Sequence, residues 1–460
     1  FIRSKNLKQI ENGFQMIYYS FKSMTEQAIA IHESQLSPTT LLEQFFENIE
    51  KETNSKNIFS EIYYKDALSE AKNSEDRQKK GRRKSFFDGI VINWKDLFDI
   101  NKKKCEGGTQ LLSKRFSEID SDVYKIAKKY GIVTIGKTHQ TELAFSGLGV
   151  NPKTATPPNS TSKLLAPGGS SSGAAVATAL SLSSAGVGSD TGGSVRIPAA
   201  WNNLVGFKPT HGKLSLKGVL KLCPSFDTVG PITKTVTDSF YLYKILKGEN
   251  LNPIDNDRLD KKKFLIDTSF LTQNLCNEVS KSFQLSINKI KKSGAKINEI
   301  DLTEINRATK LAGKLFPYEA YNNWKEVIET NPELMYPPVL SRFKGGMYIT
   351  DEEYLDSWQE LKNIRKSFIS RINKYDAVIA PTCPITPPLV QKLLECDNFF
   401  TESNLLALRN TRVGNLLGLT AISIPTQIDC CGLMLLSKPN KENSLLKSAY
   451  LLESYLNNKS

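Results

Sequence analysis

Residues 168–196 read GGSSSGAAVATALSLSSAGVGSDTGGSVR and contain two Gly-Gly-Ser turns, whose serines are Ser170 and Ser194. Between the two serines lies a charge-free, Ala-rich stretch that provides one helix length followed by one strand length. A helix and a strand in succession can bring both hydroxyls and a row of backbone N–H groups to one place. The stretch therefore predicts a site built from two turns.

Charged residues are almost absent around these turns. Between residues 145 and 206 only four side chains are ionised, namely Lys153, Lys163, Asp190 and Arg196. The uncharged run Leu164–Ser189 is long enough to cross a membrane, but its proline, glycines and serines make it too polar for that role. We therefore expect the middle of the chain to be buried core.

Strands and helices alternate on either side of this core segment. Strands are predicted within FDGIVINWKDLFDI (87–100), GIVTIGKT (131–138) and AGVGSD (185–190), with helices around 120–130 and after Gly173. Apolar strands return at DAVIAPTCPI, LTAISIP and CGLMLLS near the C-terminus. Because the core is drawn from distant parts of the chain, the pattern favours one large α/β domain with a mostly internal sheet.

Composition divides the chain into regions. Residues 1–23 are expected to be an N-terminal extension, disordered or preceding the true start at Met16 or Met24. We expect the domain itself to span 24–460, with N-terminal helices over 24–92, a catalytic core over 93–239, a charged, aromatic and mostly helical substrate-shaping region over 240–375, and a return to the core with a last helix over 376–460.

The charge balance does not indicate a nucleic-acid partner. The net charge is +13, but 48 of the 61 basic residues are lysines scattered through predicted helices. Arginine makes most base and phosphate contacts, so the excess lysine fits a compositional habit better than a designed phosphate-binding surface.

Cysteine and histidine usage indicates neither a disulfide scaffold nor a metal site. The seven cysteines include no CxxC pair, and the three histidines have no metal-ligand spacing. The N-terminus lacks a continuous apolar run of the signal-peptide kind. We expect a cytoplasmic protein that needs no metal or cofactor and no membrane, with a homodimer as the candidate assembly.

Two short motifs match chemistry that their context does not support. GIVTIGKT fits the phosphate-loop pattern, but its four intervening residues are β-branched and stiff, so it is predicted to be a strand. GSSSG (169–173) fits the nucleophile elbow of α/β-hydrolases, which needs a histidine late in the chain. The last histidine here is His211, so that interpretation is disfavoured.

The second turn is the better candidate for catalysis. Ser194 follows a predicted strand and precedes a helix-compatible segment, and glycines there permit N–H groups of Thr191, Gly192 and Gly193 to point at one oxygen. A serine nucleophile needs a base, and with histidine scarce a buried lysine of lowered pKa is the natural substitute. Lys95 directly follows a strongly apolar predicted strand.

These motifs and their flanks resemble the amidase signature family. The lysine of that family's KD turn falls on Lys95, its first Gly-Gly-Ser on Ser170 and its Asp-x-Gly-Gly-Ser on Ser194. The stretches APGGSSSG, GSDTGGSVRIPAA, VGFKPTHG and FDTVGP are also similar, and the likeness extends from about residue 24 to the end. The resemblance implies an α/β/α domain with a central mixed sheet flanked by helices.

The resemblance also implies roles for individual residues. Ser194 would be the acyl-accepting nucleophile, Ser170 in a cis peptide would carry protons, and Lys95 would be the base. Ser171 would support this network, and Asp190 would pair with Arg196 to fix the loop. The substrate-lining segment of the family falls on Ala144, Phe145 and Ser146.

Two functions remain open at this point. One is a stand-alone amidase that hydrolyses a small amide with water. The other is the glutaminase component, the A subunit, of a glutamine-dependent tRNA amidotransferase. Those glutaminases usually carry KDN and a DEFAMGSS-like segment, whereas this chain has KDLFD and TELAFSG, and CGLMLLS replaces the common GLPVGLQLVG. The first two departures favour the stand-alone amidase, and the third leaves the contacts of the acyl pocket open.

Overall fold

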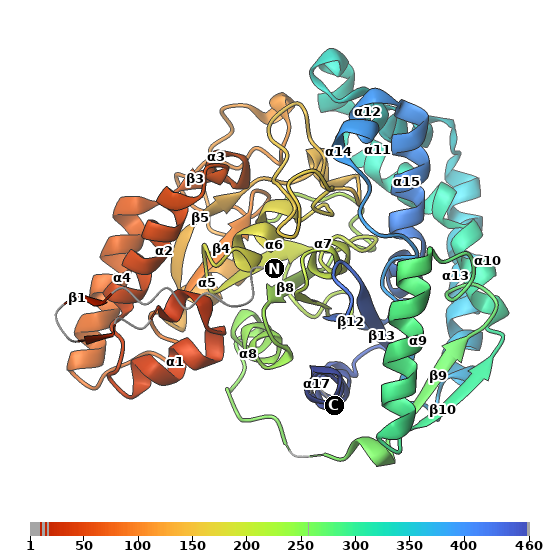
Figure 1. Ribbon diagram of the computed structural model, residues 1–460. Coiled ribbons are helices and arrows are strands. Elements are labelled where there is room, and N and C mark those ends of the chain that lie inside the picture. The colour runs from red at the N-terminus through yellow and green to blue at the C-terminus, as the bar shows by residue number, and fades with distance from the viewer. Residues whose placement is uncertain (1–9, 12–13, 16–17, 256, 458–460) are drawn as a thin grey trace.

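An eleven-stranded mixed sheet runs through the computed structural model, which describes residues 10–11, 14–15, 18–255 and 257–457 (Figure 1). Strand β4 is parallel to β5 and β6, β9 is parallel to β10 and β11, and the remaining neighbours are antiparallel. The order across the sheet is β10 (Lys296–Ile300), β9 (Lys263–Asp267), β11 (Ala377–Pro381), β13 (Gly432–Ser437), β12 (Thr420–Pro425), β7 (Val205–Lys208), β8 (Val229–Thr233), β6 (Ala185–Ser189), β4 (Val91–Lys95), β5 (Val133–Thr138) and β3 (Phe59–Ile62).

Helices cover both faces and both ends of this sheet. The α-helices are α1 (Met24–His32), α2 (Pro38–Lys51), α3 (Ser55–Ile58), α4 (Tyr64–Lys79), α5 (Asp122–Lys129), α6 (Ser172–Ala179), α7 (Arg196–Trp201), α8 (Val236–Lys247), α9 (Asn277–Lys292), α10 (Thr303–Lys310), α11 (Ala312–Thr330), α12 (Pro337–Lys344), α13 (Asp351–Arg371), α14 (Val390–Glu395), α15 (Asp397–Arg409), α16 (Thr411–Leu416) and α17 (Glu442–Asn457). Short 3₁₀ turns are η1 (Tyr19–Phe21), η2 (Gln110–Leu112), η3 (Glu142–Ala144), η4 (Leu259–Lys261), η5 (Pro332–Leu334) and η6 (Gly345–Tyr348), and β1 (Ile10–Glu11) pairs with β2 (Phe14–Gln15).

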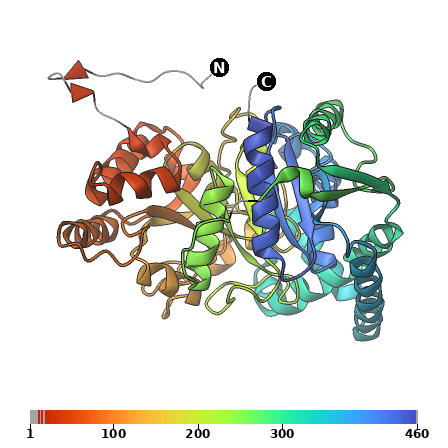
Figure 2. The same cartoon turned by 90° about the horizontal axis from the view of Figure 1, so that it is seen from below.

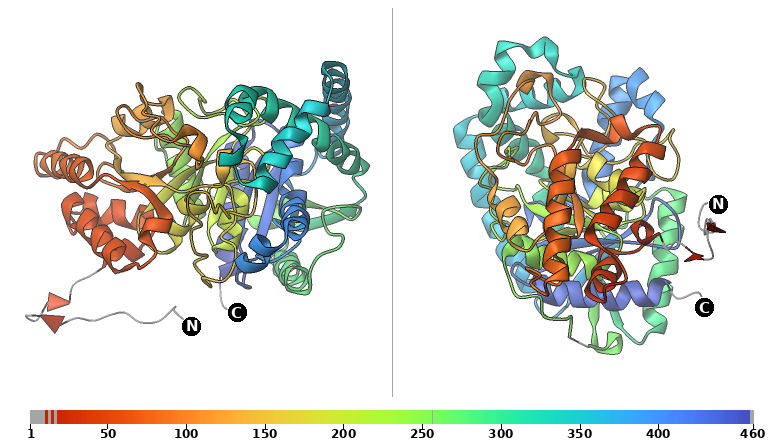
Figure 3. Two further views of the ribbon diagram at one scale, coloured as in Figure 1. Left: turned by 90° about the horizontal axis from the view of Figure 1, so that it is seen from above. Right: turned by 90° about the vertical axis from the view of Figure 1, so that its left-hand side faces the viewer.

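The layers follow from which helices contact the central strands. Helices α8 and α17 lie side by side on one face of the sheet, and α6 and α7 pack against the other (Figure 2). Helices α1, α2 and α4 lie at one end of the molecule, and α9, α10 and α13 lie at the other (Figure 3). The predicted single α/β domain with a mixed internal sheet is therefore confirmed.

The Ala-rich stretch is core, as its lack of charge predicted. Helix α6 is buried from Ser172 to Thr178 and packs on β4, β6 and β8. Small side chains let the helix approach the strands closely, since a Cβ added at Gly186 would lie 2.8 Å from the Ala174 carbonyl oxygen. This close packing places the turn before α6 directly over the end of the sheet.

Two regions expected to be mostly helical also contribute strands. Residues 59–62 form β3 within the N-terminal helices, and β9 and β10 extend the opposite edge from within 240–375. Strand β10 (KINEI) has two consecutive polar residues that interrupt the alternation of a strand, and charged helices flank both strands. Strands this short show little periodicity beside long helices. The sequence pattern therefore favoured helical regions over these residues.

The phosphate-loop match at residues 131–138 is a buried strand, as predicted. Residues Val133–Thr138 are β5, and the Lys137 ammonium donates to the Lys104 carbonyl and lies 3.5 Å from the Asp96 carboxylate. The lysine is therefore already partnered by protein groups.

Other sequence expectations concern cysteines, metals and membranes. All seven cysteines are free thiols. Within residues 18–255 and 257–457 no group of three His, Cys, Asp or Glu side chains is placed to hold a metal ion. Among the described helices, none combines the length and apolar character needed to cross a bilayer.

The extension expected over residues 1–23 lies partly outside the described residues. Its last part is attached to the body: Ser20 is buried, and its N–H donates to Gln44 Oε1 at 3.1 Å. Ser23 caps α1 through a capping box with Glu26. Ordered packing thus begins before residue 24.

Candidate active site

The two Gly-Gly-Ser turns lie against each other. The Ser171 N–H donates to the Ser194 carbonyl at 3.1 Å, and the Ser171 hydroxyl donates to the Ser189 carbonyl at 3.2 Å. Strand β6 carries Gly188 at the contact, where a Cβ would lie 2.5 Å from Ser171 Oγ, so a larger residue would push the turns apart. The helix and strand between the two serines therefore bring the second turn back to the first, as expected.

Lys95 lies at the end of β4, beneath the first turn. Its side chain is fully buried, and Nζ donates to Ser170 Oγ at 2.7 Å and to Ser189 Oγ at 2.8 Å. Because β4 pairs with β6 in parallel, the ends of the two strands bring Lys95 beside Ser189. The sequence thus identified Ser170 as a neighbour of Lys95 but missed Ser189.

Burial changes the chemistry of this amine. Desolvation lowers the pKa of Lys95 to about 7, although the charges of Asp190 and Asp227 oppose the shift. An amine with this pKa is largely uncharged just above neutral pH, so Lys95 can accept a proton there. The Gly169–Ser170 peptide bond is cis, as the family resemblance implied.

Asp190 and Arg196 form the ion pair expected from their isolation in an uncharged stretch. Both side chains are fully buried, and the carboxylate lies 2.9 Å from Arg196 Nε and Nη2. Burial opposes ionisation of Asp190, but the charge and hydrogen bonds of Arg196, the charge of Lys208 and the hydrogen bond from Asn415 together outweigh it and lower the pKa of Asp190 to about 2. Asn415 on α16 bonds to both side chains, at 2.7 Å from Arg196 Nη2 and 3.0 Å from Asp190 Oδ1, a contact that the sequence did not reveal.

Gly193 differs from its expected role. Its N–H donates to Asp190 Oδ1 at 2.9 Å, so it is not available to stabilise an oxyanion. An ionised carboxylate accepts a stronger hydrogen bond than a neutral oxygen does. The Asp190 carboxylate also accepts the Val195 N–H, so it fixes the orientation of the turn from two positions. Gly193 remains required for conformation, because its φ is +138° and a Cβ would lie 2.1 Å from Thr411 Oγ1.

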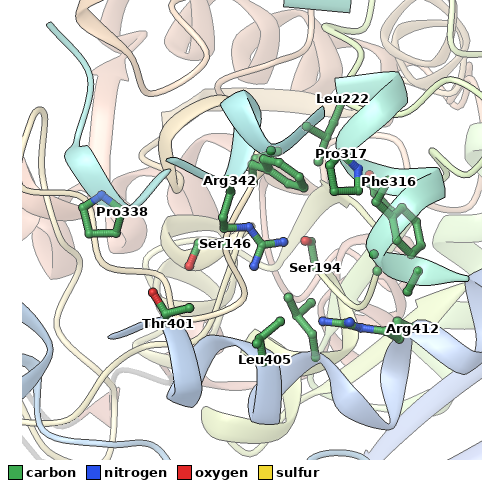
Figure 4. Close-up of a pocket in the computed structure, with 18 of the residues that line it drawn as sticks. Ser146, Ser194, Leu222, Phe316, Pro317, Pro338, Arg342, Thr401, Leu405 and Arg412 are labelled. Carbon is green, nitrogen blue, oxygen red and sulfur yellow. The ribbon is translucent and has the colours of Figure 1, made fainter. Parts of the chain in front are cut away.

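A pocket of about 330 Å³ opens over the second turn (Figure 4). Six of the predicted site residues line it: Ala144, Phe145, Ser146, Thr191, Gly192 and Ser194. The far wall is supplied by α11, α12, α15 and α16, and it includes Phe316, Pro317, Arg342, Leu405 and Arg412. The helical region after residue 240 therefore shapes the pocket, as predicted, together with residues near 405–412.

The predicted residues occupy two positions relative to this pocket. Ser194 contributes to the pocket wall, whereas Ser170, Ser171 and Lys95 are fully buried. The Lys95–Ser170 hydrogen bond is formed, but within the described residues the hydroxyls of Ser170 and Ser194 are not hydrogen-bonded to each other. The arrangement places the Ser194 hydroxyl at the pocket wall and the Lys95 amine beneath it.

Comparisons with known proteins identify the family of this chain. A family model described as Amidase matches residues 40–446. The chain is 28% identical to the A subunit of glutamyl-tRNA(Gln) amidotransferase from Halothermothrix orenii, over 93% of this chain and 96% of that protein. It is 27% identical to 2-amino-5-chloromuconic acid deaminase of Comamonas testosteroni, over 80% of this chain and 82% of that one.

A solved structure described as an amidase is also similar. It superimposes with a TM-score of 0.86 at 27% identity and covers 94% of this chain and all of its own. The chain belongs to the amidase family. It is accordingly a hydrolase that acts on the carbon–nitrogen bonds of amides.

Proposed function

We propose that this protein hydrolyses a small carboxylic amide to the carboxylate and ammonia through an acyl-enzyme on Ser194. The observation that carries the proposal is the buried Lys95 amine, 2.7 Å from Ser170 Oγ and with a pKa of about 7, beneath the pocket that Ser194 lines. A nucleophile, a proton carrier and a base are thus stacked from the pocket inward.

The first half of the reaction forms the tetrahedral intermediate that leads to the acyl-enzyme. Ser194 Oγ attacks the amide carbon and gives its proton to Ser170, which passes its own proton to the neutral Lys95 amine. Thr191 and Gly192 line the pocket, and neither N–H donates to another described residue. These two groups are available to stabilise the oxyanion.

The second half releases the products. The proton returns from Lys95 through Ser170 to the nitrogen of the substrate, the carbon–nitrogen bond breaks, and ammonia leaves. Water then attacks the ester on Ser194, and its proton follows the same route before Ser194 is restored as the carboxylate departs. The reactants are therefore the amide and water, and we place the reaction in the cytoplasm.

A second candidate is the glutaminase component of a glutamine-dependent tRNA amidotransferase. The 28% identity to such a component over almost the whole chain favours it. The replacement of KDN by KDL and of the acidic segment by TELAFSG favours the first candidate. Isolated chain that releases ammonia supports the stand-alone amidase, whereas glutaminase activity that requires co-purified partner proteins supports the second.

Labelling and turnover test the proposed nucleophile. We expect Ser194→Ala to abolish ammonia release from amides and to prevent labelling by a fluorophosphonate, with Ser341→Ala as a control elsewhere on the pocket wall that keeps labelling. Persistent labelling of the Ser194→Ala protein would show that another residue is the nucleophile.

A further inference from the structure

Two arginines are the charged residues among those that line the pocket. Arg342 comes from α12 and Arg412 from α16, and no aspartate or glutamate of the described chain lines the same pocket. Figure 4 shows both guanidinium groups directed toward the middle of the pocket, where Ser194 lies. A concentration of positive charge therefore faces the proposed nucleophile.

Neither arginine is paired with another described residue. Within residues 18–255 and 257–457 no carboxylate lies within ion-pair distance of Arg342 or Arg412, and neither guanidinium donates a hydrogen bond to another side chain or to the backbone. Arg342 Nε is buried without a hydrogen-bond partner, and its guanidinium stacks on Phe145 at 4.4 Å from the ring centroid. The contrast with Arg196, which is fully paired, is direct.

Unpaired cations that are partly removed from water are unfavourable unless something else compensates them, and both arginines are half-buried. Desolvation lowers the pKa of Arg342 to about 9 and that of Arg412 to about 10, and the charge of Arg412 adds to the shift of Arg342. Both groups still carry a positive charge at neutral pH. Such desolvated charges are normally paired, so these two arginines present an open site for an anion at the pocket wall.

We propose that Arg342 and Arg412 bind carboxylate on the acyl part of the substrate, which is then the monoamide of an aliphatic dicarboxylic acid. The proposal rests on the proposed function, since it assumes that Ser194 attacks an amide in this pocket. Apolar side chains of the wall suit a methylene chain: Leu222, Phe316, Pro317, Leu405 and Leu408. A guanidinium binds a carboxylate through two parallel hydrogen bonds, which also fixes the orientation of the amide.

The same charges disfavour an amino acid amide such as glutamine. Its α-ammonium group would enter a pocket whose described lining offers two cations and no acidic side chain. Like charges at short range in a poorly hydrated site cost several-fold or more in affinity. The pocket therefore discriminates between glutamine and the same molecule without its amino group.

Matched substrates test this inference. Glutaramate carries a carboxylate where pentanamide carries a methyl group, and L-glutamine adds an α-ammonium to glutaramate. We expect kcat/KM for glutaramate to exceed that for pentanamide by about 10- to 100-fold, and to exceed that for glutamine. The pairs succinamate with butanamide and adipamate with hexanamide extend the comparison to other chain lengths.

Variants identify which groups produce the preference. Arg342→Gln and Arg412→Gln should each lower the glutaramate-to-pentanamide ratio by about 10-fold or more, and Arg342→Lys should retain part of it. A merely structural defect would lower kcat/KM equally for both substrates and leave the ratio unchanged. Arg307→Gln is the matched control, because Arg307 is an exposed arginine on α10 outside the pocket.

A second readout does not depend on turnover. Glutarate should slow fluorophosphonate labelling of Ser194 at lower concentration than pentanoate, and this difference should disappear in Arg412→Gln. Equal protection by the two acids, or equal turnover of charged and neutral amides, would overturn the inference while labelling still supports Ser194. Absence of any labelling in the unmodified protein would instead overturn the proposed function.

Discussion

At the scale of single residues, the environment of one lysine dominates the chemistry. Among the described residues no carboxylate lies within hydrogen-bond distance of Lys95, whose two hydrogen bonds go to the hydroxyls of Ser170 and Ser189. Hydroxyl partners compensate less of the desolvation of an ammonium than a carboxylate would, so the pKa falls to about 7. The Lys95 amine is thereby able to accept a proton near neutral pH.

The first prediction concerns pH. Because the neutral amine is the active form and the folded pKa lies below the usual lysine value, kcat/KM should be constant above pH of about 7 and fall about tenfold per pH unit below it. The rate of ammonia release measured over about pH 5–9 checks this. A flat profile on the acid side would contradict a role for Lys95 as base.

The second prediction concerns Ser189. Its hydroxyl accepts a hydrogen bond from Lys95, which favours the charged amine. Ser189→Ala should therefore lower the pKa of Lys95 further, move the acid limb to lower pH and reduce kcat about 10-fold through loss of positioning. Ser189→Thr keeps the hydroxyl and should restore the profile, whereas an unchanged limb in Ser189→Ala would show that the contact does not tune the amine.

At the scale of elements, one buried ion pair joins three pieces of chain. Asp190 follows β6, Arg196 begins α7, and Asn415 on α16 bonds to both side chains. The same carboxylate accepts the N–H groups of Gly193 and Val195. The turn that carries Ser194 is thus held by a network that also fixes α16, the helix that bears Arg412.

The third prediction breaks this network. Arg196→Met leaves the Asp190 carboxylate buried and unpaired, and should lower the free energy of unfolding by about 3–5 kcal/mol. Denaturant unfolding of the single variants and of Arg196→Met with Asp190→Asn measures the coupling between them. Independent, additive losses would show that the pair does not act as a unit.

At the scale of the whole molecule, the sheet is assembled from both halves of the chain. Strands β6 and β8 are followed across the sheet by β7 and then by β12 and β13 from the C-terminal part, with β11 and β9 beyond them. Helix α17, near the end of the chain, packs against α8 and β12. The strands of residues 59–233 and those of residues 263–437 therefore form one continuous sheet, which is joined where β7 pairs with β12.

The fourth prediction follows from the continuous sheet and from the contact of α17 with α8. Thermal unfolding should be one cooperative transition, and single-tryptophan variants that retain Trp94, Trp201, Trp324 or Trp358 should report the same midpoint. These side chains lie on β4, α7, α11 and α13, so they sample the core and the outer helical layer. Separate midpoints for Trp94 and Trp358 would indicate that the helical layer unfolds independently.

The amino-acid sequence by itself determined the parts of this protein that depend on local pattern. The Gly-Gly-Ser turns, the apolar strand before Lys95 and the near absence of charge around Asp190 and Arg196 were enough to predict the α/β domain, and the family resemblance that these motifs carry implied the neighbours at its centre. Each of these features has a local physical cause. Glycines permit tight turns, an apolar run favours a buried strand, and an isolated charge in an apolar stretch needs a partner.

Tertiary structure alone decided what depends on contacts between distant segments. It showed that Ser189 bonds to Lys95, that the Gly193 N–H is taken by Asp190, and that the arginines at 342 and 412 face one pocket without partners among the described residues. No periodicity or spacing encodes these contacts, because each arises where separately folded elements pack together and exclude water.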